Sequence, residues 1–187
     1  MTLRHSLTIG FLLVSLSACT PWTRVDQASR IETKGSDYTL SLPLGWVKNT
    51  TTGNDLFITR DGPALNYILV NRQSHDTKLP RTKRVTRADM LPHEMAELVL
   101  AEWKGNEATA NLEVLANTPA FLGGKPAARV HIRYKNERGL PIERILIGMV
   151  DTKGRLYLVY EAPAIVYFQR NLAEFEAMAA SLHFQTP

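Results

Sequence analysis

Two histidines with acidic neighbours have the residue types and spacing that come nearest to catalysis or metal binding. His93-Glu94-Met95-Ala96-Glu97 begins like the helix of a zinc protease, which needs His-Glu-x-x-His to place two imidazoles on one helical face. Glu97 stands where the second histidine should be, and no third ligand follows at a recognisable spacing. His75-Asp76 is a second pair, but adjacent residues seldom act as a base and its orienting acid, and no Gly-x-Ser-x-Gly accompanies them. We therefore interpret both motifs as polar surface and expect no catalytic residue, no metal and no cofactor.

The N-terminus has the zones of a secretory signal over residues 1–18. A basic start at Arg4 precedes an apolar centre, Leu7–Leu16, and small residues end at Ala18. The apolar centre would form roughly 15 Å of helix, about half of a bilayer core. It is therefore too short for a permanent transmembrane helix. The next residue, Cys19, is the only cysteine and cannot form an internal disulfide.

Leu16-Ser17-Ala18-Cys19 resembles the bacterial lipobox. The resemblance implies cleavage before Cys19 and a diacylglyceryl thioether on its sulfur. Two or three acyl chains anchor a protein stably, so lipid on Cys19 would hold the domain on a membrane. Thr20 stands where an aspartate usually retains a lipoprotein in the inner membrane, which favours the periplasmic face of the outer membrane. An ordinary secretory signal and a free buried thiol are the alternatives.

The rest of the chain predicts one tethered domain. Residues 19–35 show no sustained period and are interpreted as the lipidated cysteine and a tether, which as a flexible coil would reach roughly 20–25 Å. Residues 36–187 form a single domain, and a domain of this size buries roughly 68–70% of its unfolded surface. A composition of 44% hydrophobic and 21% charged residues is ordinary for a globular protein.

Alternation of apolar and polar residues predicts most of the strands. Tyr38–Leu42 is interpreted as a half-buried strand that Pro43 ends. Asp55–Arg60 and Leu65–Arg72 form a hairpin around the turn Asp61-Gly62-Pro63. The later strands are predicted at Leu112–Ala116, Ala128–Lys135, Ile142–Val150 and Leu156–Tyr160, with a turn between Pro119 and Pro126.

Two segments have the 3-4 apolar spacing of amphipathic helices. One begins at a capping Asp89 and runs to about Glu107, and the other covers Ala164–Leu182. Because the turns between strands are too short for parallel crossovers, the order of elements predicts an α+β fold, with a central antiparallel β-sheet flanked by helices.

Three motifs in this order resemble the PsbP-like family. They are the entry strand Tyr38–Trp46, the hairpin Gly124-Lys125-Pro126-Ala127 and the helix end Phe175–Phe184. The family includes the photosystem II extrinsic subunit, a Ran-binding nuclear protein and bacterial lipoproteins of the DcrB type. The resemblance implies an α/β/α sandwich and a non-enzymatic role as a scaffold or binding module, and it fixes no ligand.

The formal net charge of +4 comes mainly from one segment. Near an anionic membrane surface each Lys or Arg contributes roughly 1 kcal/mol of attraction. This segment could therefore face anionic lipid or an acidic envelope protein. An ordinary solvated loop is the alternative. Nucleic acid is disfavoured because no aromatic residues interleave with the charges. The basic residues of the segment are Arg72, Lys78, Arg81, Lys83, Arg84 and Arg87.

Three functions remain open on the sequence alone. The first is a membrane-anchored envelope lipoprotein that acts as a non-enzymatic binding or assembly module, through the basic segment and the exposed edge of the sheet. The second is a carrier of a small apolar ligand between sheet and helix, which a cavity lined by Trp46, Trp103 or Phe175 would favour. The third, a cryptic hydrolase, needs convergent polar groups that the sequence does not show.

Overall fold

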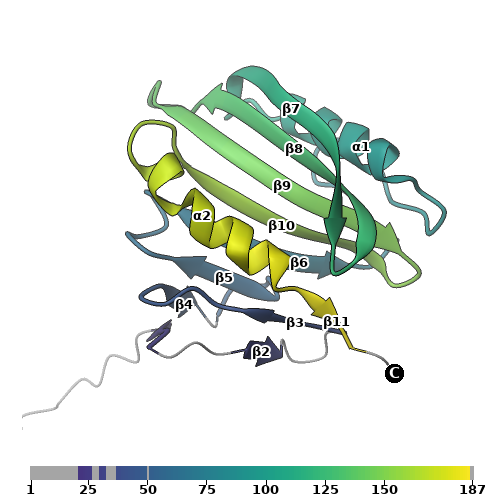
Figure 1. Ribbon diagram of the computed structural model, residues 1–187. Helices are drawn as coiled ribbons and strands as arrows, with labels where there is room; N and C mark the ends of the chain where they lie inside the picture. The colour runs from purple at the N-terminus through teal and green to yellow at the C-terminus, as the bar shows by residue number, and fades with distance from the viewer. Residues whose placement is uncertain (1–20, 27–29, 33–36, 50, 186–187) are drawn as a thin grey trace, which may run out of the picture.

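An antiparallel sheet of eight strands, with one helix on each face, forms the body of the molecule (Figure 1). The computed structural model describes residues 21–26, 30–32, 37–49 and 51–185, so the predicted signal and Cys19 lie outside the described residues. In chain order the elements are β1 (Trp22–Arg24), β2 (Arg30–Glu32), β3 (Tyr38–Ser41), β4 (Val47–Asn49), β5 (Leu56–Thr59), β6 (Tyr67–Gln73), α1 (Pro92–Lys104), β7 (Ala110–Leu122), β8 (Lys125–Lys135), β9 (Pro141–Asp151), β10 (Gly154–Pro163), α2 (Tyr167–Ala180) and β11 (His183–Phe184). The large sheet has the order β1-β4-β5-β6-β10-β9-β8-β7, and a three-stranded sheet has the order β11-β3-β2.

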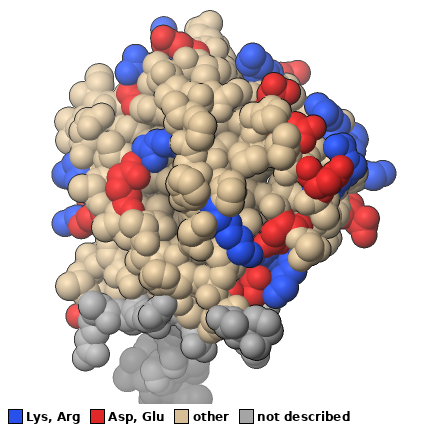
Figure 2. Space-filling view, turned by 45° about the vertical axis from the view of Figure 1, so that its right-hand side comes forward, with Lys and Arg blue, Asp and Glu red and all other residues tan. Residues whose placement is uncertain are grey.

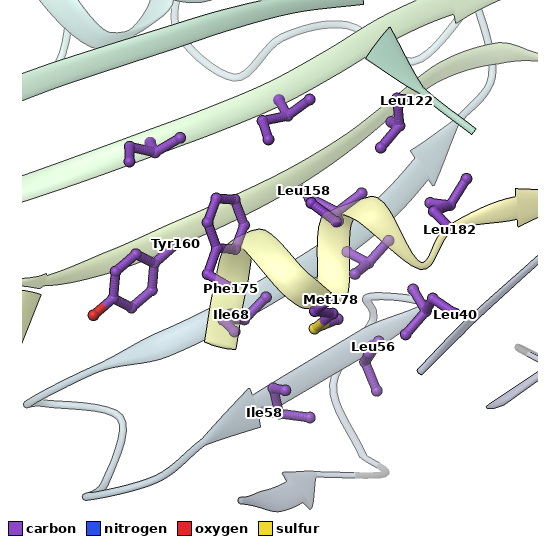
Figure 3. Packing of buried hydrophobic residues seen from close by; sticks show 14 of the residues in the cluster. Leu40, Leu56, Ile58, Ile68, Leu122, Leu158, Tyr160, Phe175, Met178 and Leu182 are labelled. Atoms are coloured by element: carbon purple, nitrogen blue, oxygen red, sulfur yellow. The ribbon is translucent and has the colours of Figure 1, made fainter. Parts of the chain in front are cut away.

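Strand alternation divides the core between the two faces of the large sheet. On β10, Leu158 and Tyr160 pack with the α2 residues Phe175 and Met178, as Figure 3 shows. Val159, between them, packs on the opposite face with residues of α1. This arrangement confirms the predicted α+β fold, because each helix covers one apolar face of a sheet whose neighbouring strands are all antiparallel.

The central strands and the first hairpin are confirmed, but β7 is longer than predicted. The structure continues β7 through Pro119 to Leu122, and only Gly123 and Gly124 form the turn to β8. Proline is acceptable there because β7 is an edge strand. The backbone N–H that proline lacks can then be one that would face away from the neighbouring strand. Both glycines have positive φ, at 58° and 79°, which a tight turn requires.

Both helices are shorter than predicted: α1 covers Pro92–Lys104 and not Asp89 to about Glu107, and α2 covers Tyr167–Ala180 and not Ala164–Leu182. The structure begins α1 at Pro92, whose fixed φ suits a first helical position. The carboxylate of Glu94 accepts a hydrogen bond from the backbone N–H of Leu91 at 2.7 Å. Asp89 therefore does not cap the helix, and its side chain pairs with Arg87 instead.

The prediction that residues 19–35 form a tether is wrong for the two stretches of it that the structure describes as strands. Trp22–Arg24 pairs with β4, and Arg30–Glu32 pairs with β3, so both stretches belong to sheets. Strands of three residues are too short to produce a detectable period, which is why the sequence indicated none. Within the described part of the chain, neither helix is long and apolar enough to cross a membrane.

Candidate functional site

Arg72 differs from the other residues of the predicted basic surface, because it lies inside an ion-pair cluster. Its side chain is 12% exposed and lies 2.8 Å from Asp151 and 3.2 Å from Asp37. Lys125 and Lys153 complete the cluster, at 3.7 Å from Asp151 and 3.1 Å from Asp37. Arg72 thus joins β6 to the end of β9 and is not available as a free surface charge, which corrects its predicted role.

The other predicted cations lie on the loop between β6 and α1 and are exposed. On the face of the molecule that Figure 2 shows, Lys and Arg lie side by side with Asp and Glu and form no continuous positive patch. Arg87, for example, pairs with Asp89 at 3.2 Å. The exposed cations of the loop are Lys78, Arg81, Lys83, Arg84 and Arg87.

The loop is fixed to the body by polar contacts at several points. The ring of His75 lies 2.9 Å from the carbonyl oxygen of Asp151 and 3.1 Å from the hydroxyl of Thr86. Glu102 on α1 accepts hydrogen bonds from the backbone N–H groups of Arg81 at 2.8 Å and Thr82 at 2.9 Å. Burial acts to raise the pKa of Glu102, but these hydrogen bonds outweigh it and lower the pKa. The carboxylate therefore stays ionised and holds the loop against α1.

A pocket of about 350 Å³ lies between α1, this loop and the large sheet. We call it the α1 pocket. Gly148 of β9 lies against the end of the Met95 side chain of α1, so a Cβ atom there would have to displace that flexible side chain. The apolar wall of the α1 pocket is formed by Leu69, Leu79, Pro80, Met95, Leu98, Val99, Leu146 and Val159.

Polar and aromatic side chains form the rest of the α1 pocket. Arg144 forms an ion pair with Glu161 and lies over the ring of Trp103, with 5.1 Å between the guanidinium carbon and the ring centroid. Burial acts to lower the pKa of Arg144, but the charge of Glu161 outweighs it and raises the pKa. Burial raises the pKa of Tyr67, so this phenol is neutral at ordinary pH. The polar and aromatic residues of the wall are Tyr67, Arg81, Glu102, Trp103, Asn106, Arg144, Arg155 and Tyr157.

Of the three aromatic residues predicted to line a cavity, one does so. Trp103 lines the α1 pocket. Trp46 and Phe175 are fully buried in the core on the opposite face of the sheet, under α2. A second pocket lies between the start of α1 and the β7–β8 hairpin, and Phe121 there is 75% exposed.

The histidines singled out for possible chemistry are either exposed or make contacts within the fold. His93 and Glu97 are exposed on α1. His131 lies 2.8 Å from Glu143 and stacks on Phe168 of α2, with 5.2 Å between the ring centroids. In the part of the chain that the structure describes, no three His, Cys, Asp or Glu side chains gather as a metal site would require.

The large sheet has edges at β1 and β7, and the β7 edge is poorly suited to adding another strand. Pro119 lacks a backbone N–H, and the pairing of β7 with β8 shifts register twice, between Ala110 and Glu113 and between Val114 and Ala116. Prolines and bulges are features that keep an edge strand from pairing with other chains. The geometry therefore favours the α1 pocket over this edge as the binding site.

Comparison with protein-family models and with curated proteins gave no match. Among solved structures, the chain resembles cyanobacterial PsbP (CyanoP) from Synechocystis sp. PCC 6803, with a TM-score of 0.52 and 15% identity over 90% of this chain and 98% of that one. It also resembles the Ran-binding protein Mog1p of Saccharomyces cerevisiae, with a TM-score of 0.56 and 11% identity over 83% of this chain and 94% of that one. At these identities the likeness establishes the fold alone, and it confirms that the fold is PsbP-like.

Proposed function

We propose that the chain is a non-enzymatic binding module, a lipoprotein of the DcrB type held at the periplasmic face of the outer membrane by lipid on Cys19. The observation that carries this proposal is the α1 pocket. Its volume of about 350 Å³ lies within the range of roughly 300–1,000 Å³ that is typical of small-molecule sites. Mog1p is named as a Ran-binding protein, so at least one protein of this fold acts by binding.

The composition of the α1 pocket supports binding rather than catalysis. The Glu102 carboxylate accepts hydrogen bonds from backbone N–H groups of the loop, and Arg144 forms an ion pair with Glu161. Neither group is placed as a free base or nucleophile beside a partner that would activate it. The apolar wall instead supplies surface for burying a small apolar ligand, as the carrier hypothesis expects.

The position of β1 bears on how an anchored domain would sit. β1 begins only three residues after Cys19, and three extended residues span about 10 Å. A lipid on Cys19 would therefore hold the β1 edge of the large sheet close to the headgroups, nearer than the tether of residues 19–35 had implied.

Replacing Cys19 tests the anchor. The variant Cys19→Ser is expected to lose nearly all incorporation of labelled palmitate and to leave the membrane fraction, because it removes the sulfur that the lipid would occupy. Fractionation of the envelope with blotting measures this. The matched variant Thr20→Asp keeps Cys19 and is expected to move the protein from the outer to the inner membrane. Palmitate labelling that persists in Cys19→Ser would refute the anchor.

A second candidate function is contact with an acidic envelope protein or anionic lipid through the β6–α1 loop. The observation that favours it is the exposure of five loop cations, Lys78 and Lys83 among them. Arg81 also lines the α1 pocket, so it belongs to both candidates. Reversal of Lys78, Lys83 and Arg84 alone therefore separates loop contact from pocket binding.

A further inference from the structure

Arg155 is a buried cation on the wall of the α1 pocket. It lies at the start of β10 and is 2% exposed. Its guanidinium donates hydrogen bonds to the carbonyl oxygen of Thr77 at 2.8 Å and to the side-chain oxygen of Gln73. The Nε of Arg155 is buried without a hydrogen-bond partner among the described residues. Both acceptors are neutral, so these hydrogen bonds bring no negative charge to the guanidinium.

The other cations of the pocket wall have acidic neighbours. Arg144 is paired with Glu161. Arg81 is exposed, and its charge helps to lower the pKa of Glu102. Arg155 forms no ion pair with a carboxylate in the described part of the chain, and the charge of Glu102, also on the pocket wall, acts on it only at longer range. Its pocket-lining neighbour on the same strand face, Tyr157, is a phenol whose pKa burial raises, and so it is neutral.

A buried cation without an ion-pair partner is costly. Burial lowers the pKa of Arg155, which shows that the surroundings disfavour its charged form even though an arginine stays protonated in proteins. Removing a charge from water is tolerated mainly when an opposite charge accompanies it. An anion in the adjoining pocket would supply that charge, and at low effective dielectric its attraction is stronger than it would be in water.

We infer that the α1 pocket binds a small amphiphile with one anionic group, a carboxylate or a phosphate, directed toward Arg155 and with its apolar part against Leu69, Val99 and Val159. This inference rests on the proposed function and adds the chemical class of the ligand. The pocket supplies both requirements, because its wall is mainly apolar and Arg155 is the buried cation on it that forms no ion pair with a carboxylate among the described residues. A free fatty acid and a monoacyl phospholipid share this chemistry.

Photo-crosslinking of the full lipid-anchored chain in its membrane tests the inference. The probes are dodecanoate with a diazirine in its tail, its methyl ester, the quaternary ammonium with the same tail, and a monoacyl phosphatidylglycerol with the same photoreactive tail. Peptide mapping by mass spectrometry measures how much of each probe reacts with the residues of the α1 pocket. A charge-assisted contact corresponds to about tenfold or more in affinity. We therefore expect the anionic probes to label the pocket about tenfold more than the ester or the cation.

Two variants locate the effect. Val99→Phe fills the pocket and is expected to abolish labelling there, whereas the control Val114→Phe, on the exposed edge strand β7, is expected to change nothing. Arg155→Met keeps the side-chain length but removes the charge, and is expected to reduce labelling by dodecanoate to the level of the ester. Because Arg155→Met could fail to fold, the comparison of probes on the unaltered chain decides the question independently.

The possible outcomes distinguish failure of the anionic-ligand inference from failure of pocket binding as the function. Equal labelling of the pocket by dodecanoate and its ester overturns the anionic ligand and leaves an apolar carrier. Failure of every probe to label the pocket overturns both the inference and pocket binding as the function. Stronger labelling by the monoacyl phospholipid identifies a membrane lipid as the source of the anion, and stronger labelling by dodecanoate identifies a free acid; both results support the inference.

Discussion

Replacing Trp46 with alanine is expected to lower the free energy of unfolding by about 3–5 kcal/mol. The indole is fully buried in the core beneath α2. Its Nε1–H donates a hydrogen bond to Glu174 at 2.8 Å, and Glu174 also pairs with Arg60 at 2.7 Å. Alanine would leave a large cavity and remove the donor that Glu174 accepts from. Urea unfolding followed by circular dichroism measures the loss.

The matched substitution is Trp103→Ala on the opposite face of the sheet. Trp103 lines the α1 pocket and is only partly buried, so its loss enlarges an existing space and is expected to cost clearly less than the loss of Trp46. It is expected to reduce labelling of the pocket by the dodecanoate probe, which Trp46→Phe should leave unchanged. Equal destabilisation by Trp46→Ala and Trp103→Ala would contradict the assignment of one residue to the core and the other to the pocket wall.

Arg72→Ala is expected to destabilise the protein by about 3 kcal/mol, because it removes the central cation of a largely buried cluster and leaves two acids with only the more exposed Lys125 and Lys153. Asp151 would lose its closest cation, and Asp37 would lose one of its two cations and keep Lys153. The control is Arg87→Ala, whose ion pairs are exposed and whose effect should stay within about 0.5 kcal/mol. If the two variants unfold at the same urea concentration, Arg72 is not the centre of a stabilising cluster.

The Arg72 cluster also predicts how stability depends on pH. Burial acts to raise the pKa of Asp151, but hydrogen bonds from Arg72 and from the N–H of Lys153, with the charge of Lys125, outweigh it and lower the pKa. The resulting stabilisation is complete above the pKa of an unfolded aspartate, about 3.9, and is lost as the pH falls through the lower pKa of the folded state. Asp151→Asn should remove this acid-dependent loss, as measured by urea unfolding between neutral and acidic pH.

Periodicity predicted the elements that are long enough to show it. The alternation of Ala128–Lys135 and the 3-4 spacing around Phe175 correspond to β8 and α2. β1, β2 and β11 have three residues or fewer and exist because a neighbouring strand pairs with them. No local pattern marks such strands, since tertiary pairing rather than propensity stabilises them.

The pocket was predictable only in part. Trp103 was a predicted lining residue, and the period of two on β10 places Arg155, Tyr157 and Val159 on one face. The environment of Arg72 was not predictable, because Asp151 is 79 positions away in the sequence. Its role as a surface cation could therefore be corrected only by the structure.

Isolation of the lipid-anchored chain from its native envelope in polymer nanodiscs, followed by mass spectrometry of what accompanies it, tests pocket binding most directly. We expect a small anionic amphiphile that is absent from the pocket-filling variant Val99→Phe and retained when Lys78, Lys83 and Arg84 are reversed to glutamate. A specific protein that is lost only in the charge-reversed variant, with no small molecule enriched over Val99→Phe, would contradict binding at the α1 pocket.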